Sequence, residues 1–136
     1  MKQGGYLKRG TSQLKRVAKH DKMSLTRLHK KAWDLQSIAI RKEEDGQCFT
    51  CPKKDDPKNM QAGHFKHGKH MDFFRENIHC QCRRCNHSLS GNGTVYAEKL
   101  EALYGFGIIQ KLSKLKDGNH IWKRSELEEI IKRYAN

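Results

Sequence analysis

Long apolar stretches are the first thing that this 136-residue sequence lacks. No run approaches the roughly 18 apolar residues that span a membrane, and the first residues have no apolar segment of the kind found in signal peptides. We therefore expect a soluble, cytoplasmic protein with no membrane partner. Hydrophobic residues make up only 35% of the chain. The core must then be thin, and a metal, a disulfide or a partner subunit is expected to support it.

Acidic residues are also scarce, because 15 Asp and Glu oppose 28 Lys and Arg, which gives a formal net charge of +13. Residues 1–42 hold twelve Lys and Arg against two Asp, a balance of +10, and the other residues hold sixteen against thirteen, a balance of +3. A basic segment on a nearly neutral body suits a nucleic-acid backbone, since each phosphate contact releases counterions. A solubility tail would have a similar composition, but the cysteine pairs described below favour nucleic acid.

Proline is nearly absent, and both prolines lie in one turn-rich stretch from Cys48 to about Cys82. The chain is interpreted as four segments: a flexible basic arm over 1–22, a basic amphipathic helix over 23–46, a core over 47–93 and a helical region over 94–136. Within the core, short strands are expected near 60–66 and 72–79.

Helix ends are predicted from their capping residues. Ser24 is expected to begin the basic helix, and Gly46 is expected to end it. Thr94 is predicted to cap a helix that runs to about Tyr104, and residues 108–116 can form another. A capping box of Ser125 with Glu128 predicts the last helix.

Five cysteines cannot all pair with one another, and reduced thiols favour metal binding over disulfides. The pairs Cys48-x-x-Cys51 and Cys82-x-x-Cys85 can fill the four positions of a closed structural zinc site. Such a site has no open coordination position, so it accounts for folding and not for reactivity. Cys80 is left over as a free thiol.

The remaining histidines and asparagines of the core can serve a phosphodiester nuclease. Such an enzyme needs a base to deprotonate water, a divalent cation such as Mg²⁺ or Mn²⁺, and a group that orients the base. Histidine suits the first role because its pKa lies near neutrality. The residues available are His64, His67, His70, Asn77, His79, Asn86 and His87.

The run from Asn77 to Asn86, NIHCQCRRCN, resembles the second half of an HNH, or ββα-metal, nuclease with zinc knuckles. Residues 62–65, AGHF, resemble the strand that presents the general base. Over most of the chain the closer resemblance is to the phage recombination protein family called NinG, or Rap in lambdoid phages. This resemblance implies a small ββα-metal core stapled by zinc, in a protein of a phage-infected or prophage-carrying bacterial host.

The resemblance also implies roles for individual residues. His64 would activate the water, Asn77 would fix the loop or ring of the base, and Asn86 would bind the catalytic cation. His79 would be a further metal ligand or a phosphate contact. Many HNH enzymes carry Asp or His before the base, whereas this chain has Gly63. Two alternatives therefore stay open: His64 binds the cation while another histidine acts on water, or His79 replaces the missing ligand.

DNA contacts are expected from exposed cations and from histidines near them. Arg83 and Arg84, between the zinc cysteines, are candidate phosphate clamps, although an exposed knuckle loop would look the same. The full set of predicted DNA-binding residues is Lys30, Lys31, Arg41, Lys66, His67, Lys69, Arg83, Arg84 and His87.

The sequence thus predicts a small α+β, zinc-stapled endonuclease that hydrolyses DNA. The family resemblance implies branched substrates such as Holliday junctions or D-loops, and resolving a junction with two cuts favours a homodimer. Two alternatives remain. One is an HNH nicking or restriction-like nuclease on ordinary duplex, and the other is a non-enzymatic zinc module that binds nucleic acid.

Overall fold

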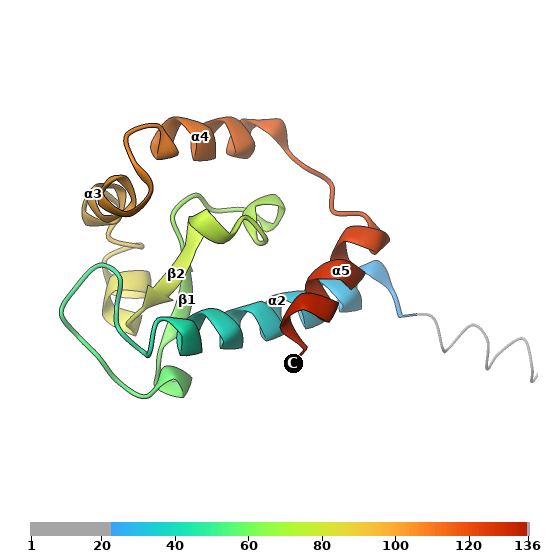
Figure 1. The fold of residues 1–136 in the computed structure, drawn as a ribbon, viewed down its shortest axis with the longest axis horizontal. Coiled ribbons are helices and arrows are strands. Elements are labelled where there is room, and N and C mark those ends of the chain that lie inside the picture. Colours follow the sequence, from blue (N-terminus) through green and yellow to red (C-terminus); the bar gives the residue numbers. More distant parts are fainter. Residues whose placement is uncertain (1–22, 136) are drawn as a thin grey trace, which may run out of the picture.

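The structure is a computed structural model, and it describes residues 23–135. A long helix, a short hairpin and three later helices make up the described chain (Figure 1), which confirms a small α+β fold. The predicted arm, residues 1–22, lies outside the described residues. The main elements are α2 (Leu25–Glu43), β1 (Gln61–His64), β2 (Ile78–Gln81), α3 (Gly93–Tyr104), α4 (Ile108–Gly118) and α5 (Arg124–Tyr134).

A capping serine and a glycine turn fix the two ends of helix α2. The Ser24 hydroxyl accepts a hydrogen bond from the Arg27 backbone N–H at 3.3 Å, which confirms Ser24 as the N-cap. Its buried residues are spaced four apart, at Leu28, Ala32, Gln36 and Ile40. After the last turn, Gly46 has a φ of +65°, and a Cβ there would lie 1.8 Å from the Asp55 carbonyl oxygen. Only glycine fits this position, so the chain turns away from the helix here.

Strands β1 and β2 form a two-stranded antiparallel sheet beside α2. Gly63 lies opposite His79, and His64 lies opposite Ile78. Because neighbouring residues of a strand point to opposite faces, the side chains of His64 and His79 leave the sheet on opposite sides. Short helical turns flank the strands: η1 (Pro57–Asn59), η2 (Lys69–Met71), η3 (Arg75–Asn77) and η4 (Arg84–Ser88).

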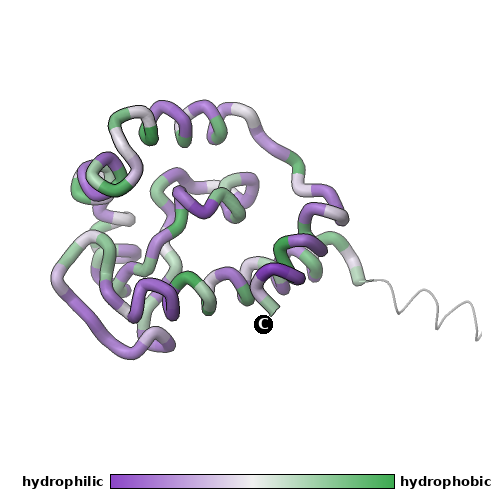
Figure 2. Tube along the Cα trace, in the orientation of Figure 1, coloured by the Kyte–Doolittle hydropathy of each residue, from purple (hydrophilic) through white to green (hydrophobic). Residues whose placement is uncertain are grey.

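The buried residues of the described chain form three small clusters and no single large core. One joins α2 to α5, one joins α3 and α4 to the connection between the strands, and the third consists of cysteines and Met60. Hydrophobic and hydrophilic residues are interspersed along the helices in Figure 2, and α2, α4 and α5 each have a distinct apolar side. Among residues 23–135, no helix is both long and apolar enough to cross a membrane.

Three sequence predictions about local structure are wrong. The second strand begins at Ile78 and not near residue 72, because residues 72–77 bend through η3. Helix α3 begins at Gly93 without a side-chain cap from Thr94, since Asn92 precedes it with a φ of +52°. At α5, the predicted capping box of Ser125 with Glu128 is wrong. The N-cap is Lys123, and its backbone N–H donates a hydrogen bond to the Glu126 carboxylate at 3.2 Å.

Candidate active site and cysteine cluster

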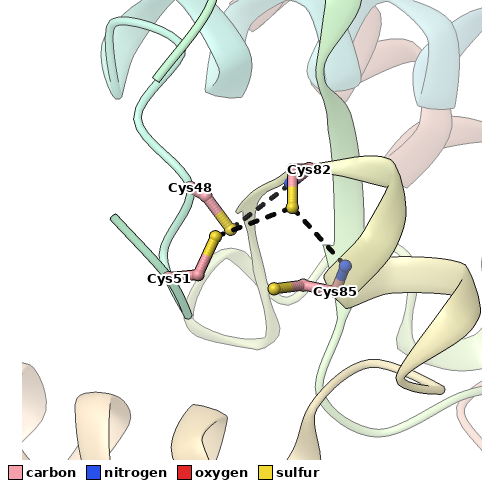
Figure 3. A group of neighbouring side chains, drawn as sticks. All are labelled: Cys48, Cys51, Cys82 and Cys85. Carbon is pink, nitrogen blue, oxygen red and sulfur yellow. Dashed lines mark hydrogen bonds between the residues drawn. The ribbon is translucent and has the colours of Figure 1, made fainter. Parts of the chain in front are cut away.

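Four cysteines from three segments of the chain meet in one cluster. Cys48 and Cys51 lie in the loop after α2, Cys82 follows β2 directly, and Cys85 lies in η4. All four sulfur atoms lie within 4.8 Å of one another, and their side chains converge in Figure 3. These four thiols could hold a metal such as zinc, as the sequence predicts.

The protonation of the cluster agrees with a cation-binding role. Burial raises the pKa of the Cys48 thiol, but hydrogen bonds from the backbone of Cys82 and Thr50 outweigh it and bring the pKa to about 7. Burial, together with the neighbouring thiols, raises the pKa of Cys51 to about 12. Three of these cysteines are buried and Cys51 is half-buried, so ionised sulfurs here would repel one another, and a bound cation would neutralise them. Cys80 is buried outside this cluster as a free thiol.

His64 lies at the end of β1, where two side chains hold its ring. Its Nε2 is 2.7 Å from Asp72 Oδ1, and the ring stacks on Trp33 with centroids 4.9 Å apart. The other oxygen of Asp72 is 2.6 Å from His29 Nε2. The Asp72 backbone oxygen accepts a hydrogen bond from Gln36 Nε2 at 2.7 Å. His64 is thus fixed by a nearly buried carboxylate that α2 holds from its other side.

Sequence reasoning missed Asp72, His29 and Trp33. Asp72 follows His64 by eight residues in a segment interpreted as a strand, so no spacing marked it. His29 precedes Asp72 by 43 residues and comes from a different element. Only the packing of α2 against the hairpin brings these groups together.

Asn77 fixes the chain that follows β1. Its Oδ1 accepts a hydrogen bond from Lys66 N at 2.8 Å, and its Nδ2 donates to the Lys66 carbonyl oxygen at 2.9 Å. The Asn77 side chain is fully buried, so this pair is shielded from water. The hydroxyl of Tyr96 donates to the Gly63 carbonyl oxygen at 2.8 Å and secures β1 itself. Asn77 therefore orders the loop beside His64, and its part in catalysis stays a prediction.

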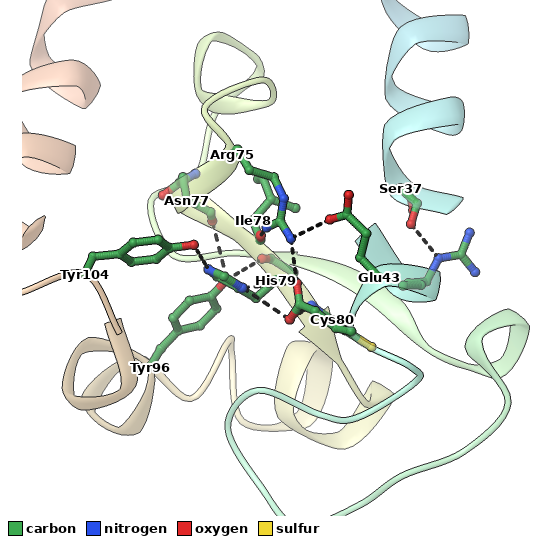
Figure 4. A network of polar contacts seen from close by, with 12 residues as sticks. Ser37, Glu43, Arg75, Asn77, Ile78, His79, Cys80, Tyr96 and Tyr104 are labelled. Carbon is green, nitrogen blue, oxygen red and sulfur yellow. Dashed lines mark hydrogen bonds and ion pairs between the residues drawn. The ribbon is translucent and has the colours of Figure 1, made fainter. Parts of the chain in front are cut away.

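His79 is buried on the other face of the sheet and has partners of its own. Figure 4 shows its ring between Tyr104 and the carboxylate side chains at the C-terminal end of α2. Its Nδ1 lies 3.1 Å from Glu44 Oε2, and its Nε2 lies 3.1 Å from the Tyr104 hydroxyl. Its ring stacks on Phe49 with centroids 4.0 Å apart. The structure does not bring His79 together with His64.

Two amide oxygens meet beside Gly63. A Cβ at this glycine would lie 1.8 Å from Gln81 Oε1 and 3.1 Å from Asn86 Oδ1. Gln81 Oε1 is buried and is the one such side-chain N or O atom among residues 23–135 without a hydrogen-bond partner. The Asn86 amide nitrogen donates to Gln61 Oε1 at 2.8 Å, which leaves its own oxygen free to turn toward Gly63. The Gln81 amide occupies the space that a side chain at position 63 would take.

Most of the predicted DNA-binding residues are exposed, but Arg41 is not. The Arg41 guanidinium donates to the carbonyl oxygens of Ser37, Pro57 and Met60 at 3.0 to 3.3 Å, so it connects α2 to η1. Lys66 is half-buried against Phe65. The exposed members are Lys30, Lys31, His67, Lys69, Arg83, Arg84 and His87.

His67 adjoins the ring of His64, with centroids 6.2 Å apart. Partial desolvation of the ring lowers the pKa of His67, and the nearby His64 and Lys116 side chains lower it further. His67 is therefore neutral at pH 7 and adds little positive charge beside His64.

Comparison with known proteins agrees with the sequence resemblance. A family model described as Bacteriophage Lambda NinG protein matches residues 6–136, nearly the whole chain. No significant match was found among curated proteins or among solved structures. The chain therefore belongs to the bacteriophage lambda NinG family, which implies a phage protein related to recombination.

Proposed function

We propose that the protein is a metal-dependent DNA endonuclease of the HNH type, with His64 as its general base. The observation that carries the proposal is the 2.7 Å hydrogen bond between His64 Nε2 and Asp72 Oδ1. An ionised carboxylate only accepts hydrogen bonds, so Asp72 fixes the proton on Nε2 and leaves the Nδ1 lone pair as the base. Within the described part of the chain, His64 Nδ1 has no hydrogen-bond partner.

The proposed reaction is hydrolysis of one phosphodiester bond. His64 Nδ1 takes a proton from water, and the resulting hydroxide attacks the phosphorus atom. The bond from phosphorus to the leaving sugar oxygen breaks, and that oxygen takes a proton from solvent. Asp72 keeps the ring oriented and stabilises the imidazolium that forms, while Asn77 holds the adjacent loop.

A divalent cation, Mg²⁺ or Mn²⁺, would stabilise the negative charge on the phosphate when bound. Such hard cations prefer oxygen ligands, and Gln81 Oε1 and Asn86 Oδ1 both lie beside Gly63, on the side where a Cβ would point. A buried, unpaired acceptor is costly, so Gln81 Oε1 fits a position that gains a partner. These two residues would hold the cation on the face of the sheet that Gly63 and Gln81 share, and Gln81 would supply the ligand that position 63 lacks, while His64 acts from the end of β1.

Replacing Gln81 with Glu should tighten Mn²⁺ binding by the zinc-loaded protein about tenfold, because a carboxylate adds negative charge to two uncharged donors at nearly the same volume. The measurement is a titration followed by the electron paramagnetic resonance signal of free Mn²⁺. Gln110→Glu is the matched control, since it adds the same charge on an exposed position of α4. Equal tightening in both variants would show that Gln81 is not a ligand.

DNA is the proposed substrate, and branched DNA the preferred form. The support is the family membership and a net charge of +13 concentrated in residues 1–42. The test compares cleavage of a four-way junction with cleavage of a linear duplex of the same sequence, in Mg²⁺ and in Mn²⁺. Faster cutting of the junction supports the proposal. Equal cutting would indicate an HNH nuclease on ordinary duplex, and binding without any cutting would indicate a non-enzymatic zinc module.

A homodimer on the junction is part of the proposal, because resolution requires two cuts. Sedimentation of the protein with junction DNA should show two chains per junction. One chain per junction would exclude a dimeric resolving enzyme.

A further inference from the structure

A groove lies beside Trp33 and Asp72, the two residues that contact the ring of the proposed base, and its lining comes from α2, from η2 and from the linker between α4 and α5. Its volume is about 540 Å³, within the range of sites for small organic ligands. We call it the tryptophan groove; the lining residues that matter here are His29, Trp33, Lys69, His70, His120 and Trp122.

The tryptophan groove combines aromatic rings with positive charge. Trp33 contributes to the lining from α2, and Trp122 contributes to it from the linker. His120 meets the Trp122 ring edge-on, with centroids 4.5 Å apart. Lys69 is exposed at the groove and has no ion pair within the described residues. The carboxylate in the lining, Asp72, is already shared by His29 and His64.

We propose that this groove binds an unpaired nucleobase of a DNA strand whose phosphate lies at His64. Flat rings of every base stack on aromatic side chains, and a nearby lysine suits the flanking phosphate. Bases inside a duplex are stacked on one another and enter a protein site only after extrusion. The groove would therefore favour strands that have lost pairing, as at a branch point. This inference rests on DNA being the substrate.

The connection to the proposed chemistry is direct. Trp33 lines the groove and also stacks on the His64 ring. Asp72 lines the groove and also bonds His64 Nε2. A nucleobase held in the groove thus lies one side chain away from His64, the general base that would activate water. Recognition of an unpaired nucleotide and cleavage next to it would then use the same side chains.

The test is equilibrium binding of a fluorescein-labelled 12-nucleotide oligothymidine and of a 12-base-pair blunt duplex, measured by anisotropy without added Mg²⁺ or Mn²⁺. Trp122→Leu should weaken oligothymidine binding about tenfold, the size of one lost base stack, and leave duplex binding within about twofold. His120→Ala should act in the same direction with a smaller effect. Phe106→Ala is the matched control, because this aromatic is 90% exposed on the turn between α3 and α4, outside the groove.

Trp122 also packs on Phe73, so its variant is checked for zinc content and circular dichroism. If Trp122→Leu misfolds, the groove proposal is tested with His120→Ala instead, because His120 is exposed. An equal loss of affinity for oligothymidine and for duplex, or no loss of affinity for either, would overturn the groove proposal. Tighter oligothymidine binding after removal of residues 1–22, with no effect of His120→Ala, would show that the basic segment occupies the groove instead. Because no cleavage is measured, selective oligothymidine binding would stand even if the nuclease proposal failed.

Discussion

Replacing Cys82 with serine should unfold the centre of the molecule and abolish stoichiometric zinc binding. Structural zinc contributes on the order of 10 kcal/mol in small zinc-binding peptides. The free energy of unfolding of a domain of this size is only about 5 to 15 kcal/mol. Loss of zinc binding through one missing ligand would therefore remove most of this stability. The destabilisation is expected to be largest at this cluster, because its buried residues are only cysteines and Met60, with no other large apolar side chain to hold it together.

The measurements for Cys82→Ser are zinc content and cooperative thermal unfolding by circular dichroism. Cys80→Ala is the matched control, since Cys80 is a buried cysteine two residues earlier that is outside the sulfur cluster. We expect it to keep one zinc per chain and a cooperative transition. A Cys82→Ser protein that retains zinc and melts at the wild-type temperature would contradict the assignment of the four cysteines to one site.

Replacing His64 with alanine should lower the rate of DNA cleavage by about 10²- to 10⁴-fold, the usual contribution of a general base. Zinc content and DNA affinity should stay near wild type, because the ring is half-buried and outside the three apolar clusters. The measurements are single-turnover cleavage with saturating protein and anisotropy on the same junction. Wild-type cleavage by the variant would exclude His64 as the base.

Asp72→Asn tests whether the carboxylate acts through His64. An asparagine amide can donate to Nε2, which would place the ring proton on Nδ1 and remove the base at neutral pH. We expect a large fall in the single-turnover rate with little change in DNA affinity. A purely structural role would instead lower stability and affinity together, so the split between rate and affinity separates the two explanations.

Local features of the site were predictable from the sequence because they depend on close spacing. Each C-x-x-C pair brings two sulfurs to one side of a tight turn, and the two pairs meet as predicted. The N-cap of α2 was also readable, since Ser24 bonds an N–H only three residues away. The second strand was placed too early because Phe73 and Phe74 favour a strand, whereas the chain forms the helical turn η3 at Arg75–Asn77 before β2 begins.

The surroundings of His64 and Gly63 were not predictable in the same way. Asp72 and His29 reach each other across 43 residues, and the Gln81 amide fills the space beside Gly63 from the opposite strand. The strand register also decides that His79 faces away from His64, toward Glu44 and Tyr104. No spacing within one segment encodes such contacts.

The sequence by itself determined the basic charge, the helices and the four cysteines that could hold a metal, because these depend on composition and on neighbours a few residues apart. Only the tertiary structure decided which groups surround the candidate base. That choice depends on how α2 packs against the hairpin, and such packing is set by the combined shape of several elements and not by any one of them.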